Sequence, residues 1–190
     1  MKKIILTGLA VFAFTFANAQ EKGKFRVGLD LGYAIPSGGG GVLFAIEPKY
    51  NIADNMNVGL RIAGAAMAKE FSGDGESLEA KIGTSASYVG TYDYYFTGSS
   101  FVPYVGAGAG IYSLSNAEFD VDGMTGSADL DSKSKFGGLV RAGFELGKFR
   151  MGVEYNIVPK SKINNSDVTA KNSYVGIHLG FYLGGGKWSK

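Results

Sequence analysis

Hydrophobic and polar residues alternate one by one along most of this chain, which is the period of a β-strand with one apolar face. The clearest stretch is 136–158, with the sequence F-G-G-L-V-R-A-G-F-E-L-G-K-F-R-M-G-V-E-Y-N-I-V. Two alternating runs flank Gly147 and Lys148, and glycine at the first central position is typical of a two-residue type II′ turn. The pattern predicts an antiparallel hairpin centred on these two residues.

A two-residue turn fixes which residues of the two strands lie opposite each other. The predicted apolar pairs are Leu146 with Phe149, Phe144 with Met151, Ala142 with Val153 and Val140 with Tyr155. On the other face the predicted pairs are Glu145 with Arg150, Gly143 with Gly152, and Arg141 with Glu154. This register predicts two ion pairs, with their signs exchanged between the strands.

The same alternation predicts eight strands and leaves no sustained helical period. The expected strands are 24–36, 42–52, 57–69, 84–96, 101–114, 136–146, 149–158 and 173–183. Connections at one end are tight. At the other end the first connection, 37–41, is short but rich in glycine, and three are long: 70–83, 115–135 and 159–172. An even number of strands with alternating tight and long connections is typical of a transmembrane β-barrel. We therefore predict an all-β fold, an eight-stranded antiparallel up-and-down transmembrane barrel.

One face of the predicted strands is apolar, and the other carries five basic and five acidic residues. These ten are Arg26, Asp30, Glu47, Lys49, Arg61, Asp93, Arg141, Glu145, Arg150 and Glu154. An eight-stranded barrel is only just wide enough for side chains to fill, so the large apolar side chains of eight strands would not fit inside. Buried charges are tolerated when they are paired. We predict that the apolar face contacts lipid and that the ten charges form a paired network in the lumen.

Aromatic residues near the strand ends predict a girdle at each membrane interface. The girdle near the tight turns is expected to contain Tyr50, Tyr94, Tyr95, Phe96, Phe101 and Phe149. The girdle near the long connections is expected to contain Tyr33, Tyr112, Phe136 and Tyr155.

The first residues have the features of a secretory signal peptide. Lys2 and Lys3 precede an apolar run at 4–16, and Ala17-Asn18-Ala19 forms a small-residue cleavage site. The run is too short to span a bilayer as an anchor. We predict a cleaved signal at 1–19 and a barrel domain at 20–190.

Composition excludes several classes of protein. Removal of Lys2 and Lys3 reduces the 19 basic residues to 17, which equals the 17 acidic residues, so the exported chain lacks the basic excess of a nucleic-acid-binding protein. The absence of cysteine excludes disulfides and thiol chemistry.

Three features together resemble the small outer-membrane β-barrel proteins of the Bacteroidetes type, described as porin-family or OmpX/OmpW-like. They are A-N-A-Q at 17–20, P-Y-V-G-A-G-A-G at 103–110, and the alternating glycines. The resemblance implies a monomer in the outer membrane of a Gram-negative bacterium, surrounded by lipid and inserted by the barrel-assembly machinery. Such chains usually end on an aromatic assembly signal. Residues 184–190 follow the last strand here, so either Phe181 with Tyr182 or Trp188 would serve.

No candidate site in the sequence carries a complete chemistry, so we predict no catalytic residue, cofactor or metal ion. His178 is the only histidine and lies on the lumen face; a lipid-modifying enzyme would need a nucleophile motif that the chain lacks. The acidic residues of the 115–135 connection, Glu118, Asp120, Asp122, Asp129 and Asp131, lack the further ligands and closing glutamate of a calcium loop. The glycines at 38–41 lack the lysine and helix of a phosphate-binding loop.

We predict a structural or surface-recognition role through the long connections, without catalysis. Two alternatives remain open from the sequence. A narrow porin-like channel or carrier for small solutes would use the lumen charges. A soluble lipocalin-like carrier would be extracted without detergent.

Overall fold

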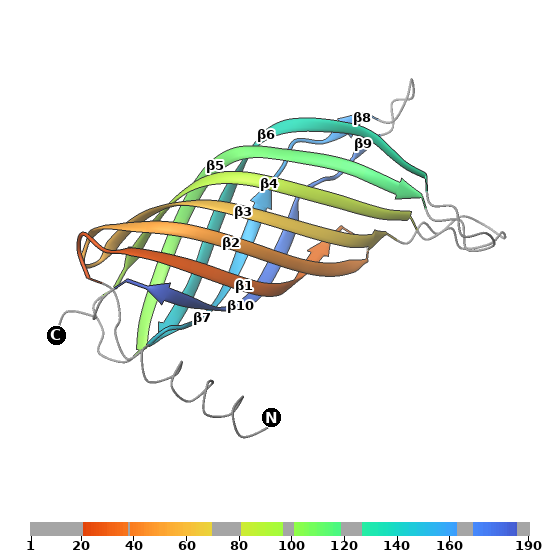
Figure 1. Ribbon diagram of the computed structural model, residues 1–190. Helices are drawn as coiled ribbons and strands as arrows, with labels where there is room; N and C mark the ends of the chain where they lie inside the picture. The colour runs from red at the N-terminus through yellow and green to blue at the C-terminus, as the bar shows by residue number, and fades with distance from the viewer. Residues whose placement is uncertain are drawn as a thin grey trace, which may run out of the picture.

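The structure is a computed structural model, and it describes residues 21–37, 39–69, 81–96, 101–118, 127–162 and 169–185 (Figure 1). The predicted signal peptide and the tail at 186–190 lie outside these ranges. Within them the regular elements are all β-strands. No helix among the described residues is long and apolar enough to cross a membrane.

Eight strands close into one antiparallel barrel, as the sequence predicted. They are β1 (Phe25–Pro36), β2 (Gly40–Ala53), β3 (Met56–Lys69), β4 (Lys81–Tyr95), β5 (Phe101–Glu118), β6 (Ser127–Leu146), β7 (Phe149–Ile157) and β10 (Tyr174–Gly184). Each strand pairs with its neighbours in the chain, and β1 pairs with β10 to close the barrel. Closure gives each of these eight strands two partners, so the barrel itself has no open edge among the described residues.

The β6–β7 hairpin has the predicted register, with Leu146 opposite Phe149, Glu145 opposite Arg150, and Arg141 opposite Glu154. Gly147 has a φ of 60°, a left-handed conformation that costs glycine little because it has no Cβ atom. The two-residue turn is therefore confirmed, and it fixes the side-chain direction along both strands.

Alternate residues of the strands point outward and are apolar. Along β7 exposed and buried residues alternate without exception, with Met151, Val153 and Tyr155 outside. Aromatic rings outside the lumen contact each other at the end where β1 begins: Phe25 with Tyr50 at 5.0 Å between ring centroids, and Phe101 with Phe144 at 4.9 Å. Two residues predicted in the girdles are placed wrongly, because Tyr95 and Tyr112 are 1% and 0% exposed and point into the lumen.

All three predicted long connections contain β-structure, so those boundaries were wrong. β4 begins at Lys81, inside the predicted 70–83 connection. β5 and β6 extend through most of 115–135, and they pair beyond a register shift between Leu114 and Asn116. The short strands β8 (Ser161–Lys162) and β9 (Thr169–Ala170) pair within 159–172, at the end of the barrel where the long connections lie (Figure 1). Where a strand extends beyond the apolar outer surface of the barrel, it needs no apolar face. The alternation of apolar and polar residues therefore ends before the strand does.

The two ends of the barrel differ in the chain segments they carry. The tight turns at 54–55 and 147–148 lie at the end where β1 begins and β10 finishes. There Glu21 donates a backbone hydrogen bond to Gly185, and Gly185 donates to Phe25. This fixes the beginning and the end of the barrel to each other at one rim.

Candidate functional site: the lumen charge network

All ten charged residues predicted for the lumen lie inside the barrel. Their exposed fractions are between 0% and 4%: Arg26, Asp30, Glu47, Lys49, Arg61, Asp93, Arg141, Glu145, Arg150 and Glu154. They come from β1, β2, β3, β4, β6 and β7, because every second residue of these strands points inward. Five basic and five acidic side chains are therefore buried in one interior.

Glu47 on β2 is the carboxylate with the most partners. Arg141 donates to both of its oxygens, at 2.6 and 3.0 Å, and Arg150 donates to Oε2 at 3.3 Å. Lys49 and Arg61 each place a nitrogen 3.6 Å from Oε2. The hydroxyl of Thr91 completes the set by donating to Oε1 at 2.7 Å. Four of the five lumen cations thus depend on one buried carboxylate.

Asp93 on β4 is the second carboxylate at the same level. Arg141 donates from Nε and Nη2 to its two oxygens, both at 2.8 Å, and Lys49 donates to Oδ2. Arg141 consequently holds Glu47 and Asp93 together through paired hydrogen bonds, an arrangement that suits the planar guanidinium group.

Arg61 and Arg150 connect this cluster to Asp30 and Glu154. Arg61 lies 2.6 Å from Asp30 and 2.9 Å from Glu154, and Arg150 Nε lies 3.1 Å from Asp30. Arg150 Nη2 lies 3.2 Å from Nε2 of His178. Since arginine only donates, this contact is a hydrogen bond only when Nε2 of His178 carries no proton.

Arg26 lies in the charged layer that is closest to the end of the barrel where β1 begins. It contacts Glu145 through two hydrogen bonds of 3.0 and 3.1 Å and donates to the hydroxyl of Tyr95. Its guanidinium carbon lies 3.8 Å from the centre of the Tyr182 ring, a cation–π contact. Sequence reasoning did not assign these tyrosines to the network, although the alternation that placed the charges inside also places Tyr95, Tyr104 and Tyr182 there.

The two ion pairs predicted across the β6–β7 hairpin are wrong in their partners. Glu145 pairs with Arg26 and not with Arg150, and Glu154 pairs with Arg61 and not with Arg141. The register is as predicted, but long side chains in a narrow closed barrel extend toward the axis. They therefore meet charges from strands that are distant in the sequence.

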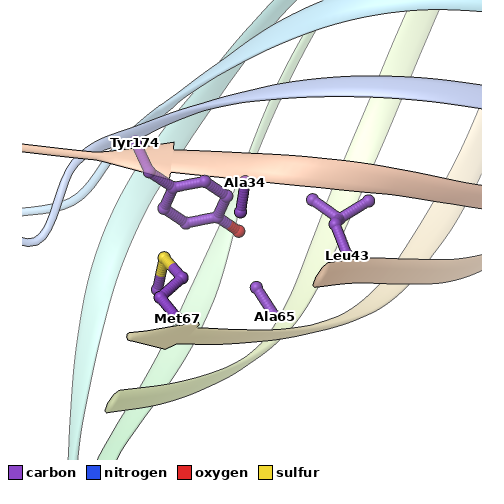
Figure 2. Close-up of a cluster of buried hydrophobic side chains, with 5 residues drawn as sticks. All are labelled: Ala34, Leu43, Ala65, Met67 and Tyr174. Atoms are coloured by element: carbon purple, nitrogen blue, oxygen red, sulfur yellow. The ribbon is translucent and has the colours of Figure 1, made fainter. Parts of the chain in front are cut away.

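The lumen becomes apolar toward the end where the long connections lie. One buried cluster there consists of Ala34, Leu43, Ala65, Met67 and Tyr174, and Figure 2 shows their side chains directed toward a common space. A second cluster consists of Val89, Tyr112, Leu139 and Val158. Between this layer and the charges, Tyr112 donates to Asn156 at 2.9 Å, and Asn156 donates to Glu154 at 3.0 Å.

These layers fill the barrel. The largest fully buried side chains include Arg61, Arg150, Tyr95, Tyr104, Tyr112 and Tyr182, all of them in the lumen. A continuous water-filled passage would leave its lining side chains accessible to water, whereas the ten charged residues are at most 4% exposed. Filling of this kind is what an eight-stranded barrel allows.

Lumen glycines make room for the charged groups. A Cβ atom on Gly180 would lie 2.1 Å from Oδ1 of Asp30 and 2.5 Å from the backbone oxygen of Leu29. Asp30 cannot easily move, because Arg61 and Arg150 hold both of its oxygens. Part of the high glycine content thus serves the packing of the ion network.

Gly180→Ala is expected to lower the free energy of unfolding by about 1–3 kcal/mol, the usual cost of overpacking a filled interior. The control is Gly64→Ala on the outer face, where a Cβ atom meets nothing within 4 Å. Urea unfolding of the refolded barrels, followed by far-UV circular dichroism, measures both. Equal stabilities of the two variants would contradict the close packing around Asp30.

The other candidate sites gain no support from the described residues. No group of three or more histidine, cysteine, aspartate or glutamate side chains among them is arranged to hold a metal ion. The calcium-like stretch at 120–123 lies outside the described residues. Of the glycine run at 38–41, Gly40 and Gly41 begin β2 and lead into no helix.

Comparison with known proteins gives one family match and several structural ones. The profile of the family described as "Outer membrane protein beta-barrel domain" matches residues 4–181. The outer membrane protein OprG from Pseudomonas aeruginosa is similar in structure, with a TM-score of 0.58, 16% identity, and coverage of 87% of this chain and 98% of that one. Neisserial surface protein A (NspA) has a TM-score of 0.54, 19% identity, and coverage of 84% and 95%. Identities this low indicate a shared fold only. The comparison with curated proteins found no significant match.

Proposed function

Because the chain belongs to the outer membrane protein beta-barrel domain family, as the match over residues 4–181 shows, we propose that it acts at the cell surface through the long connections of a closed barrel. Its role in this proposal is structural or one of surface recognition, without catalysis and without transport through the lumen. The family places the protein in the outer membrane of a Gram-negative bacterium.

The filled lumen is the observation that carries this proposal. Opposite charges bind each other at 2.6–3.6 Å in the charged layers, and buried tyrosines lie at the end where β1 begins. A solute would have to separate several buried ion pairs to pass, and breaking one such pair costs about 3–5 kcal/mol. The segments left for interaction are those outside the barrel wall.

The direction of the barrel in the membrane follows from the family pattern of short periplasmic turns and longer extracellular loops. The connections at 70–80, 119–126 and 158–173 would then face outside, and the turns at 54–55 and 147–148 the periplasm. Export through a cleaved signal at 1–19 and insertion by the barrel-assembly machinery are part of the same proposal, as is a monomeric barrel domain at 20–190. The Bacteroidetes-type subgroup rests on the motif at 103–110 and stays a prediction.

The absence of catalysis is supported by the position of His178. This residue is 0% exposed, and its ring nitrogens face Arg150 and Glu154. A general base must reach its substrate within hydrogen-bond distance, and lipid lies on the other side of the barrel wall. His178 therefore acts as a packing residue of the network.

Conductance of the refolded protein in planar bilayers tests the proposal. We expect no discrete conductance steps from a protein that shows a heat-modifiable band, and none from Glu154→Gln if that variant folds. Steps in the wild-type protein that change size in Glu154→Gln would overturn the closed barrel and identify a narrow channel. We expect that neither the wild-type protein nor Glu154→Gln changes the baseline conductance of the bilayer.

A further inference from the structure

A pocket on the outside of the barrel wall combines an apolar floor with positive charge. It has a volume of about 500 Å³ and lies between the ends of β1, β7 and β10 at the rim with the long connections. Its lining is Ile35, Pro36, Ser37, Tyr155, Val158, Lys160, Lys171, Asn172, Ser173, Tyr174 and Val175. Its lining contains none of the ten charged residues of the lumen, although Val158 and Tyr174 also belong to the buried apolar clusters described above.

The floor of the pocket belongs to the membrane-facing surface. Ile35 and Tyr155 are 40% and 44% exposed, and they alternate with residues that point into the lumen. Tyrosine near the end of a membrane strand is typical of the headgroup level of the bilayer. An occupant of this floor would therefore place acyl chains against the wall and its polar part at the rim.

The rim of the pocket is cationic. Lys160 and Lys171 are both exposed there, and the lining contains no acidic side chain. The ammonium group of a third lysine, Lys135, donates to the backbone oxygen of Lys160 at 2.6 Å and adds to the positive charge. Lysine binds phosphate groups as a point charge, and basic clusters at membrane level bind anionic lipid headgroups.

Hydrogen bonds hold the two segments that carry the lysines. Val158 and Ser173 bond to each other twice, at 3.1 and 3.2 Å, and Asn172 donates to the backbone oxygen of Pro159 at 2.6 Å. The chain after β7 and the chain before β10 are thus joined beside the pocket. The residues next to Lys160 and Lys171 are therefore held beside the apolar floor.

We propose that this pocket binds a phosphorylated acyl glycolipid of the outer leaflet, with its acyl chains on Ile35 and Tyr155 and its phosphate groups at Lys160 and Lys171. The choice of the outer leaflet rests on the orientation given under the proposed function. A lipid fits better than a soluble anion because two residues of the lining, Ile35 and Tyr155, belong to the exposed apolar face of the wall.

Binding of fluorescent lipid A with two phosphates to the full-length refolded protein in non-ionic detergent tests the proposal. The double variant Lys160→Gln/Lys171→Gln is expected to weaken the apparent Kd about tenfold or more, since each lysine near an anionic headgroup contributes on the order of 1 kcal/mol. The control Lys22→Gln/Lys24→Gln removes two exposed charges from the opposite end and should bind like the wild type. Lys160→Arg/Lys171→Arg should keep the affinity.

Two further probes separate the chemistry of the occupant. Dephosphorylated lipid A should bind the wild type as weakly as intact lipid A binds the double glutamine variant. Inorganic pyrophosphate, if it displaced lipid A completely at equal concentration, would identify a soluble anion site and overturn the proposal. Equal affinity of the glutamine variant and the wild type would also overturn it. The conductance experiment uses bilayers without lipid A. A conducting lumen would therefore overturn the closed barrel without bearing on this site, and unchanged lipid A affinity in the glutamine variant would overturn the site without bearing on the closed barrel.

Discussion

Glu47→Gln is expected to lower the free energy of unfolding by about 3–5 kcal/mol, the cost of removing one partner from a buried ion pair. Glutamine keeps the shape of the side chain and can still accept from Thr91. It removes the charge that Arg141, Lys49, Arg61 and Arg150 share, and it leaves five buried cations against four anions. Urea unfolding of the barrel in lipid vesicles, followed by the heat-modifiable band, gives the value.

Two variants control this experiment. Glu21→Gln makes the same chemical change at an exposed position and should stay within about 0.5 kcal/mol of the wild type. Glu47→Gln combined with Lys49→Met restores four cations to four anions and should recover part of the loss. A cost for Glu47→Gln no larger than that for Glu21→Gln would mean that Glu47 is not the shared anion of the network.

The register and the side-chain directions could be predicted from the sequence because both follow from a period of two. Once the Gly147–Lys148 turn is placed, each residue of β6 and β7 has a fixed partner and a fixed face. The same period placed Arg26, Asp30 and Glu47 inside without any knowledge of their partners. Strand number and fold class follow from the repetition of this pattern.

The ion-pair partners could not be predicted, because they depend on the height of each residue in the closed barrel. Arg26 and Glu145 are 119 positions apart in the chain and meet near one rim. The tilt of the strands and the closure of the barrel set this height. The register of a single hairpin gives no information about either of them. Arg26, Tyr95, Glu145 and Tyr182 all lie close to a tight turn or to a chain end at the same rim, and this shared position is the signal in the sequence that places them in one layer.

Strand boundaries beyond the membrane were missed for a different reason. The residues 127–135, S-A-D-L-D-S-K-S-K, include only two apolar residues, yet they belong to β6. Outside the bilayer a strand gains nothing from an apolar face, so only its backbone pairing with β5 identifies it. Alternation therefore reports the membrane-spanning part of a strand and not its full length.

Leu179→Arg is expected to lower the free energy of unfolding by about 2–4 kcal/mol, because it places a charge on the lipid side near the bilayer midplane. Leu179 is 58% exposed and lies in the middle of β10, between Leu31 of β1 and Met151 of β7. These neighbours are also apolar and exposed, so nothing beside Leu179 can pair with the guanidinium group. Unfolding in phospholipid vesicles measures the cost.

The matched control is Leu146→Arg, at the last position of β6 beside the tight turn. Leu146 is 48% exposed, so the two sites differ mainly in depth. An arginine near the interface can extend into water and should cost about 0–1 kcal/mol. A membrane barrel therefore predicts a clear difference between the two substitutions. A soluble carrier with the same fold has water along its whole outer surface and predicts equal, small costs, so equal values would contradict the membrane assignment of the outer face.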